Sequence, residues 1–388
     1  GALDIVTGRQ ISEQPYQGSL FLSQNGSTWT ADQESDMTFR LFRNQFSLTP
    51  ATAQFKLNAP AANTPIDLIN LITGDMAISD TSLTYRFNST VNGTGLSAGL
   101  KPITPSEDYY MNDGYNRRVL TTQNNSFVVQ ATMATLDTAV SPVIDTTRFG
   151  IIAVENILNN LPLANSGFIV TNGGSGYANS GDVTVTISGG NGSDATARAN
   201  VTGSNVIDAI VLTNSGGSGY TTSPTITITP GSGGGSGAVV TYNGEDKKSG
   251  GNSNVRYITR KVNLADGFDS GDLRVYLTAY KPDGAGINVY YKLLSNSDVD
   301  DFDDKNYQLM TQLGDTNYIS LNSDDLREFT FAPGISGSAN NSVSYTAGST
   351  AYRNFRTFSI KIVLTGTNPT DPPRVRDFRA IALPEGTV

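Results

Sequence analysis

The residues of this chain that could do chemistry are its carboxylates, and the densest group of them is a run of aspartates. The run consists of Asp298, Asp300, Asp301, Asp303 and Asp304. Oxygen-rich loops of this kind can bind calcium, but an EF-hand loop also needs a Gly at its sharp turn and a Glu at its last ligand position. This run has neither, so the sequence favours a solvated acidic loop over a calcium site.

Two further functions of the carboxylates have less support in the sequence. The segment 266–272 (DGFDSGD) could surround a cation, but a structural turn ahead of the next strand is the favoured interpretation. Paired carboxylates can also hydrolyse glycosidic bonds. With 35 Asp and Glu residues, some pair will lie close in any fold, and nothing in the sequence selects one. A polysaccharide-degrading enzyme is therefore the weakest alternative.

The chain contains no His and no Cys. This excludes Ser-His-Asp triads, thiolate metal sites, cysteine nucleophiles and disulfides. The Gly-rich stretches match neither the Walker nor the dinucleotide pattern, and no expected helix follows them to present amides to a phosphate. We expect no cofactor and no metal, and a protein that is not an enzyme.

Composition points away from nucleic acids and membranes. Charged residues make up 16% of the chain, against about 25% in ordinary soluble proteins. The net charge is −9, which opposes binding to phosphate backbones, and no run of apolar residues is long enough to span a membrane. A surface this poor in charge suits burial against partner proteins. The chain opens at Gly1 without an initiator Met, and we expect a processed or partial chain.

Five aromatic residues are candidates for an interface or for contact with a glycan: Trp29, Tyr177, Tyr220, Tyr276 and Tyr280. Trp29 is the only tryptophan, and an anchor in a core or interface is favoured over sugar stacking. We expect Tyr177 and Tyr220 to pack over Gly-rich turns rather than to stack on sugars. Tyr276 and Tyr280 lie opposite the aliphatic face of their strand, where a subunit interface could cover them.

Strands along the chain are predicted from the alternation of apolar and polar residues. Residues 273–280 place Leu273, Val275, Leu277 and Ala279 on one face, and 287–294 follow after a Lys-Pro-Asp-Gly turn, as a hairpin or a sandwich corner. Similar runs lie at 37–43, 83–87, 126–130, 355–364 and 375–383. A short capped helix is possible at 64–72, and 156–161 is ambiguous. The basic residues of the last strands are expected to face solvent or a subunit: Arg353, Arg356, Lys361, Arg374, Arg376 and Arg379.

The middle of the chain is a duplicated unit. The motif TNGGSGY at 171–177 returns as TNSGGSGY at 213–220, and each copy continues into an alternating strand and a Gly-rich turn. Repetition of this kind marks a modular unit that buries its face against its neighbour. The segment after it, 245–251 (EDKKSGG), is a polar linker by composition. We expect a repeat module inserted into a larger sandwich.

Several segments resemble large virion proteins of T-even-like myophages, especially those of marine cyanobacteria. In residues 14–46 the resemblance rests on Pro15, Tyr16, Asn25, Gly26, Thr28, Trp29, Thr30, Gln33, Asp36, Phe39 and Phe46. The stretches 109–118 (YYMNDGYNRR), 141–145 (SPVID), 257–282 and 375–383 (VRDFRAIAL) look like the same proteins. The GGSGY-type repeat is also similar to one that recurs in phage virion proteins. The resemblance implies a tail or baseplate component and supplies no active site.

The expected fold is therefore all-β, with a jelly-roll-like β-sandwich interrupted by a two-copy β-repeat insertion. We expect a β-rich region at 1–105, sandwich halves at 106–165 and 252–388, and the inserted repeat module at 166–251. The expected function is that of a non-catalytic structural protein of a bacteriophage virion, in the tail or baseplate or as a fibre-attachment scaffold. We expect it to be a homo-oligomer, by analogy a trimer, that binds other virion proteins. The alternative is a carbohydrate-binding module that recognises the host surface.

Overall fold

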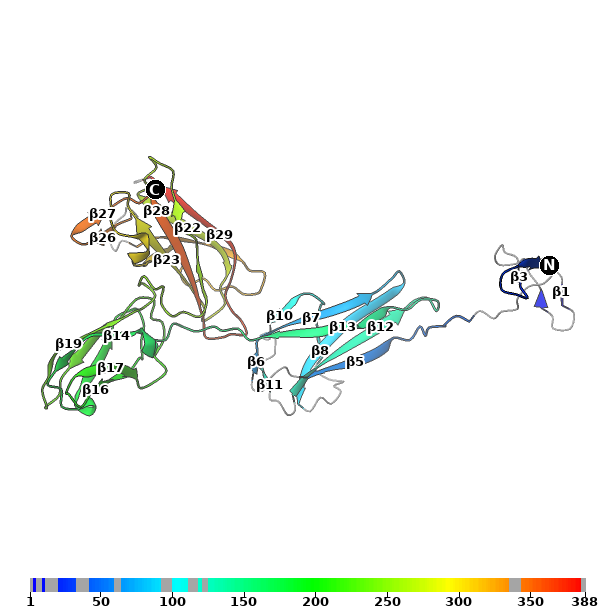
Figure 1. Ribbon diagram of the computed structural model, residues 1–388, viewed down its shortest axis with the longest axis horizontal. Helices are drawn as coiled ribbons and strands as arrows, with labels where there is room; N and C mark the ends of the chain where they lie inside the picture. Colours follow the sequence, from blue (N-terminus) through cyan, green and yellow to red (C-terminus); the bar gives the residue numbers. More distant parts are fainter. Residues whose placement is uncertain are drawn as a thin grey trace. The chain divides into compact units, whose positions relative to one another are not determined.

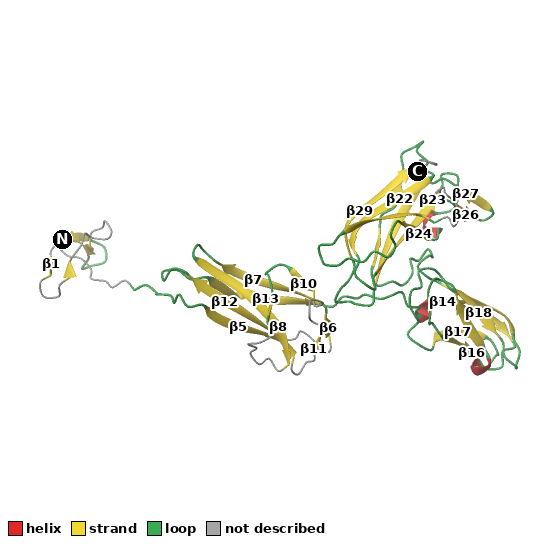
Figure 2. Cartoon of the chain, turned by 180° about the vertical axis from the view of Figure 1, so that it is seen from behind, coloured by secondary structure: helices red, strands yellow, loops and turns green. Residues whose placement is uncertain are grey.

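The computed structural model describes residues 3–4, 9–10, 20–32, 42–58, 64–91, 100–110, 118–120, 125–334 and 343–384. Across them the chain is built of strands and loops, and its helices are the single turns η1 (Asn165–Gly167), η2 (Ser180–Asp182) and η3 (Phe302–Asp304) (Figure 2). None of these turns has the length or apolar character needed to cross a membrane. The expected all-β fold class is confirmed.

The first strands form two short antiparallel hairpins. These pair β1 (Leu3–Asp4) with β2 (Arg9–Gln10), and β3 (Leu20–Leu22) with β4 (Thr30–Asp32). The strand expected at 37–43 falls mostly outside the described residues, as does much of the segment 14–46 that carries the family resemblance.

Two larger sheets follow, and we call them together the first sandwich. Their strands are β5 (Ala51–Asn58), β7 (Leu68–Met76), β8 (Thr81–Val91), β9 (Lys101–Pro102), β10 (Asp108–Tyr110), β12 (Asn125–Thr135) and β13 (Val143–Val154). One sheet has the order β10-β7-β13 and the other β5-β12-β8-β9. Aromatic rings meet between the sheets, because Phe55 lies 4.2 Å from Phe149 and Phe87 lies 4.9 Å from Tyr109 between ring centroids.

The short helix considered at 64–72 is wrong. Residues Thr64–Ile66 form β6, which pairs with β11 (Arg118–Leu120), and the following residues form β7. β7 is the central strand of its sheet, and Ile69 and Leu71 are fully buried in it. Hydrogen bonds to a neighbour on each side and this burial outweigh the local capping signal, which is a weak preference.

The expected sandwich halves at 106–165 and 252–388 are also corrected by the strand pairing. Strands β10 to β13, which lie in 106–165, pair with β5 to β8, which precede residue 106. The strands after residue 255 pair among themselves. Alternation indicated which residues are strands, but partners far apart in sequence are chosen by packing that a single sequence does not display.

The repeat module contributes six strands, three from each copy of the repeat. The first copy supplies β14 (Phe168–Ser175), β15 (Thr184–Ser188) and β16 (Ala197–Val201), and the second supplies β17 (Ile207–Leu212), β18 (Thr225–Thr229) and β19 (Ser236–Tyr242). β14 pairs with β19 and β17 with β16 (Figure 1), and β15 pairs with β18. The first strand of each copy therefore pairs with the last strand of the other, so the two copies are interlocked.

The remaining strands form what we call the second sandwich. They are β20 (Arg256–Ile258), β21 (Val262–Asn263), β22 (Asp272–Tyr280), β23 (Gly286–Leu294), β24 (Gln308–Leu313), β25 (Arg327–Pro333), β28 (Thr357–Thr365) and β29 (Arg374–Leu383), with the small hairpin β26 (Tyr345–Ala347) and β27 (Thr350–Tyr352). The order is β20-β28-β23-β24-β25-β22-β29, with β21 also on β28. The pairs β22–β29, β23–β28 and β24–β25 are nested, as in a hairpin rolled up into a jelly roll.

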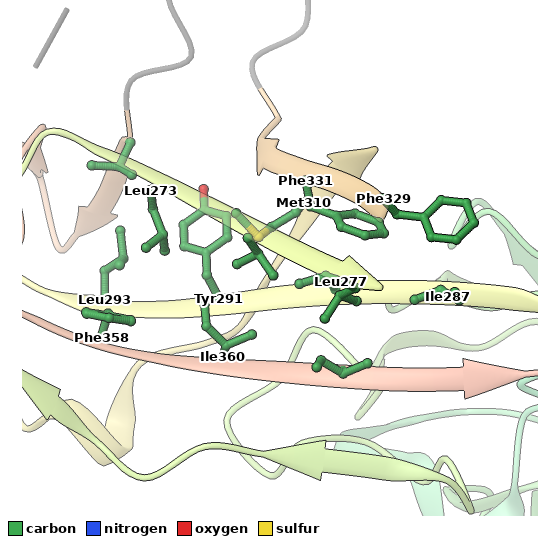
Figure 3. Packing of buried hydrophobic residues seen from close by; sticks show 14 of the residues in the cluster. Leu273, Leu277, Ile287, Tyr291, Leu293, Met310, Phe329, Phe331, Phe358 and Ile360 are labelled. Carbon is green, nitrogen blue, oxygen red and sulfur yellow. The ribbon is translucent and has the colours of Figure 1, made fainter. Parts of the chain in front are cut away.

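The core of the second sandwich confirms the predicted alternation. Leu273, Val275, Leu277 and Ala279 are all fully buried on β22. Figure 3 shows Leu273 and Leu277 packed with side chains of the other strands, among them Ile287, Tyr291, Met310, Phe331, Phe358 and Ile360. Burying a large aliphatic or aromatic side chain contributes about 1.5–3 kcal/mol, so this cluster is the main source of the domain's stability.

β22 and β23 do not form a hairpin. β22 pairs with β25 and β29, whereas β23 pairs with β24 and β28. The turn between them carries Gly284 at a φ of 70°, a left-handed conformation that glycine adopts without strain. The Lys-Pro-Asp-Gly turn is therefore a sandwich corner, the second of the two arrangements that the sequence left open.

Candidate functional site

The aspartate run, which extends into η3, forms ion pairs with lysines. Lys305 Nζ lies 2.5 Å from a carboxylate oxygen of Asp298 and 2.7 Å from one of Asp300, and Lys248 Nζ lies 2.8 Å from Asp304. Burial opposes the charged form of Asp298, but hydrogen bonds from Lys305 and Tyr345 outweigh it and hold the pKa of Asp298 below its ordinary value. The run is thus partly a packed ion-pair network, and only its members outside these ion pairs match the expected solvated loop.

The second acidic segment, 266–272, is a structural turn, as the favoured interpretation predicted. Asp272 at its end is buried and accepts hydrogen bonds from the Leu273 N–H at 2.7 Å and from Arg274 Nη1 at 2.9 Å. Asp266 pairs with Arg356. Among the described residues, no group of three or more His, Cys, Asp or Glu side chains is arranged to hold a metal ion.

Tyr177 and Tyr220 occupy equivalent places in the interlocked repeat module. Both side chains are buried, at 2% and 5% exposure, so neither is an exposed glycan or interface contact. The Ala238 N–H donates to the Tyr177 hydroxyl at 3.3 Å, and the Ala195 N–H donates to the Tyr220 hydroxyl at 3.4 Å. Each tyrosine comes from one copy of the repeat and bonds to the backbone of the other copy.

Glycine turns make room for these rings, as the sequence predicted, but each turn belongs to the opposite copy of the repeat. A Cβ atom added at Gly235 would lie 2.4 Å from the ring of Tyr177, and one added at Gly192 would lie 2.4 Å from the ring of Tyr220. Such distances are well inside van der Waals contact, so any side chain there would displace the ring. The repeated motif is therefore a packing device that joins the two copies.

The two tyrosines of β22 have different environments. Tyr280 is buried at 4% exposure, donates its hydroxyl hydrogen to Asp371 at 2.8 Å and lies under the guanidinium of Arg374. Burial, together with Asp371, raises the pKa of Tyr280 to about 12. Tyr276 is half-buried beneath Arg379, whose guanidinium carbon lies 5.2 Å from the ring centroid. Tyr280 is thus covered by residues of its own chain, and of the two tyrosines only Tyr276 keeps an exposed surface for a partner.

Lys361 departs from the expectation for the basic residues of the last strands. It is fully buried on the face of β28 that points away from the sandwich core. Its Nζ lies 2.9 Å from Glu245 Oε2, donates to the Glu245 and Gly250 carbonyl oxygens, and lies 4.3 Å from the Tyr290 ring centroid. Burial holds the pKa of Lys361 below its ordinary value, although the Glu245 carboxylate opposes this shift.

Glu245 fixes the segment that was expected to be a polar linker. It is 1% exposed, and its Oε1 accepts hydrogen bonds from the Asn252 and Ser253 N–H groups at 2.8 and 2.7 Å. The segment before the repeat module lies on the same face of the second sandwich, because Leu161 packs with Tyr290 and Val363. Both connections to the module are therefore anchored on the second sandwich.

Sequence reasoning missed this ion pair. Only one member of the pair stands out in the sequence. Lys361 is the single charged residue of the apolar run 358–364 (FSIKIVL). A charge in such a strand must be paired or excluded from the core. Its partner, Glu245, lies 116 residues away in a segment whose composition is that of a linker.

Trp29 has an exposed side chain, at 61%, beside the turn between β3 and β4. The turn is stabilised by Asn25, whose side-chain oxygen accepts from the Ser27 and Thr28 N–H groups at 3.1 and 2.8 Å. Trp29 is therefore not part of a core formed by the described residues.

The chain matches no protein-family model and no curated protein sequence. Among solved structures, the N-terminal CBM22-1-CBM22-2 tandem domain of Xyn10C from Paenibacillus barcinonensis is similar over 86% of this chain and 91% of its own, with 8% identity and a TM-score of 0.18. A TM-score that low carries no argument about function. The fold and sites define an all-β chain with sandwich-like domains and an interlocked repeat module.

Proposed function

We propose that the chain is a non-catalytic structural component of a tailed-phage virion, located in the tail or baseplate or as a fibre-attachment scaffold. The observation that supports the proposal is that several polar side chains that could otherwise contact a ligand serve internal packing. Lys361 and Glu245 form a buried ion pair, and the buried Tyr177 and Tyr220 join the two repeats. The resemblance of 257–282 and 375–383 to myophage virion proteins supports the location.

Particle labelling tests the location. Tailed-phage particles that encode the chain would be purified and probed with gold-labelled antibodies raised against the full chain. We expect the label on the tail or baseplate and peptides of the chain in the particle by mass spectrometry. Particles that lack the chain, or that carry it only in the head, would contradict the proposal.

The scaffold is proposed to be a homo-oligomer with partners among other virion proteins. The low charged fraction, 16%, supports it, because permanent interfaces exclude charge from their centres. Tyr276 is the aromatic residue of β22 that keeps a surface for such an interface. Sedimentation velocity should show an assembly, and Tyr276→Lys should weaken it; Tyr280 is unsuitable for this test because its hydroxyl is bonded to Asp371.

The absence of catalysis is tested on host surface polysaccharide. The purified chain should release no reducing ends above a buffer control. Release that disappears when one Asp or Glu is changed to its amide would identify an enzyme and overturn the non-catalytic proposal.

Glycan binding is the second candidate, and the exposure of Trp29 is the observation that favours it. An indole that is 61% exposed can stack on a sugar face. Because Trp29 is the only tryptophan, emission excited at wavelengths that tyrosine does not absorb reports on this position alone. A saturable change in this emission on titration with host glycans, together with a heat of binding by calorimetry that is lost in Trp29→Ser and kept in a Tyr276→Ser control, would favour recognition of a host surface.

A further inference from the structure

The second sandwich is open along one side. β20 and β29 are the two ends of its strand order, so each has one edge without a strand partner in the described part of the chain. The free edge of a strand presents unpaired N–H and C=O groups, and it is a template for another strand. β29 is the longer edge, with ten residues from Arg374 to Leu383.

An apolar groove of about 400 Å³ lies between these two edges. Its apolar lining consists of Val255, Tyr257, Ile362, Leu364, Val375 and Phe378. Tyr257 pairs across the strands with Ile362, which belongs to the core and is 4% exposed. Tyr257 therefore lies on the core-facing side of β20, yet its side chain is 58% exposed. The core of the sandwich is not closed at this place.

The rim of the groove carries positive charge. Arg256 and Arg376 line it, and neither takes part in an ion pair among the described residues. Arg256 Nη1 donates to the Gly250 and Gly251 carbonyl oxygens, which leaves the charge of Arg256 without a carboxylate partner there. The one acid in the lining, Asp377, already lies 3.5 Å from Arg379 Nε. This local excess stands on a chain whose net charge is −9. It favours a ligand with carboxylates.

A second copy of β29 does not fit this edge. β29 carries three arginines, Arg374, Arg376 and Arg379, against one acid, Asp377, so pairing two copies of it would bring two strands of net positive charge together. Like charges placed opposite each other on neighbouring strands are destabilising. The arginines therefore act against self-association through this edge and select for an acidic partner.

We propose that the free edge of β29 and the adjoining groove bind an extended segment of another protein, with alternating apolar and acidic residues, by strand addition. Main-chain hydrogen bonds to β29 supply affinity, and alternate side chains enter the groove beside Tyr257 and Phe378. Carboxylates on the other face meet Arg256 and Arg376. The inference goes beyond the proposed virion role, because it specifies the chemistry of a partner and can fail without affecting the location of the chain.

The test uses the full chain and a labelled peptide of alternating Val and Glu, with ten residues to match β29. Fluorescence anisotropy should show saturable binding, and hydrogen exchange should slow at amides of 374–383. A Val and Lys peptide, and a Val and Glu peptide with alternate N-methylated amides, should each bind at least about tenfold more weakly. The first control tests charge and the second tests main-chain pairing.

Two variants test the site itself. Arg376→Glu reverses the charge of an exposed rim residue, and Tyr257→Asp puts a carboxylate into the groove; each should weaken binding of the Val and Glu peptide at least about tenfold. Arg198→Glu is the matched control, because Arg198 is exposed on β16 of the repeat module. Absence of binding at millimolar peptide, equal binding of the Lys peptide, or unchanged binding to both variants would overturn the inference. None of these results bears on the particle labelling.

Discussion

Lys361 and Glu245 form an ion pair that is closed to solvent, with Lys361 Nζ 2.9 Å from Glu245 Oε2 and side-chain exposures of 0% and 1%. The pair joins the outer face of β28 to the segment that leaves the repeat module. Tyr290 and Tyr307 complete the enclosure, with ring centroids 4.3 and 4.9 Å from the ammonium nitrogen. A connection that looks flexible by composition is thereby attached to a folded domain.

Removing one member of this pair should be strongly destabilising. Lys361→Met leaves the Glu245 carboxylate buried and unpaired, and we expect the free energy of unfolding of the second sandwich to fall by about 3–5 kcal/mol. Urea denaturation followed by tyrosine fluorescence measures it. Lys56→Met, a change of the same type at an exposed lysine, should cost less than about 0.5 kcal/mol.

The double variant Lys361→Met, Glu245→Gln separates pairing from packing. If the loss in the single variant comes from the uncompensated carboxylate, neutralising it should recover a large part of the stability. Strictly additive losses in the two single variants would show that the two residues do not act as a pair.

The glycines beside the two tyrosines should be intolerant of a methyl group. Gly192→Ala would place a Cβ 2.4 Å from the ring of Tyr220, and we expect a loss of about 1–3 kcal/mol in the stability of the repeat module. Gly203→Ala is the control, because nothing lies within 4 Å of the added atom. Thermal unfolding of the two variants compares them; an equal melting temperature would contradict the packing of Tyr220 against this turn.

The repeat module should be dispensable for folding of the second sandwich, provided that Glu245 is retained. Its ends are adjacent, because the Asn243 N–H donates to the Gly167 carbonyl oxygen at 2.8 Å. Replacing 168–242 by a short Gly-Ser bridge should leave cooperative unfolding of the sandwich intact. A longer deletion, 168–251, removes Glu245 and should lower the midpoint of that transition. Loss of cooperative unfolding in the shorter deletion would contradict an independent module.

The network around Asp298 and Lys305 should make stability depend on pH in acid. Hydrogen bonds from Lys305 hold the pKa of Asp298 below its ordinary value, so the native state binds fewer protons than the unfolded state in this range. The contribution of Asp298 is therefore complete above its unfolded pKa of about 3.9 and is lost as pH falls through the lower folded value. Asp298→Asn should flatten the decline in denaturation midpoint below pH 4, and an unchanged decline would contradict a contribution of Asp298.

Much of the fold could be predicted from local pattern. Alternation identified β22, β23, β28 and β29, and it assigned Leu273 and Val275 to the core face, because a strand that buries one side must alternate. The motif at 171–177 and 213–220 predicted two copies of one unit, and its glycines predicted room for the tyrosine rings. These inferences succeeded because each depends on residues close together in the chain.

The choice of partner could not be predicted in the same way. Tyr177 packs against a glycine turn of the other copy, β10 to β13 join strands that precede them, and Lys361 finds a carboxylate 116 residues away. Each of these outcomes depends on contacts between segments distant in sequence, whose free energy arises only when several strands are already in place. The alternation of side chains predicts which face of a strand a residue occupies. Packing between distant segments determines which residue it contacts on that face.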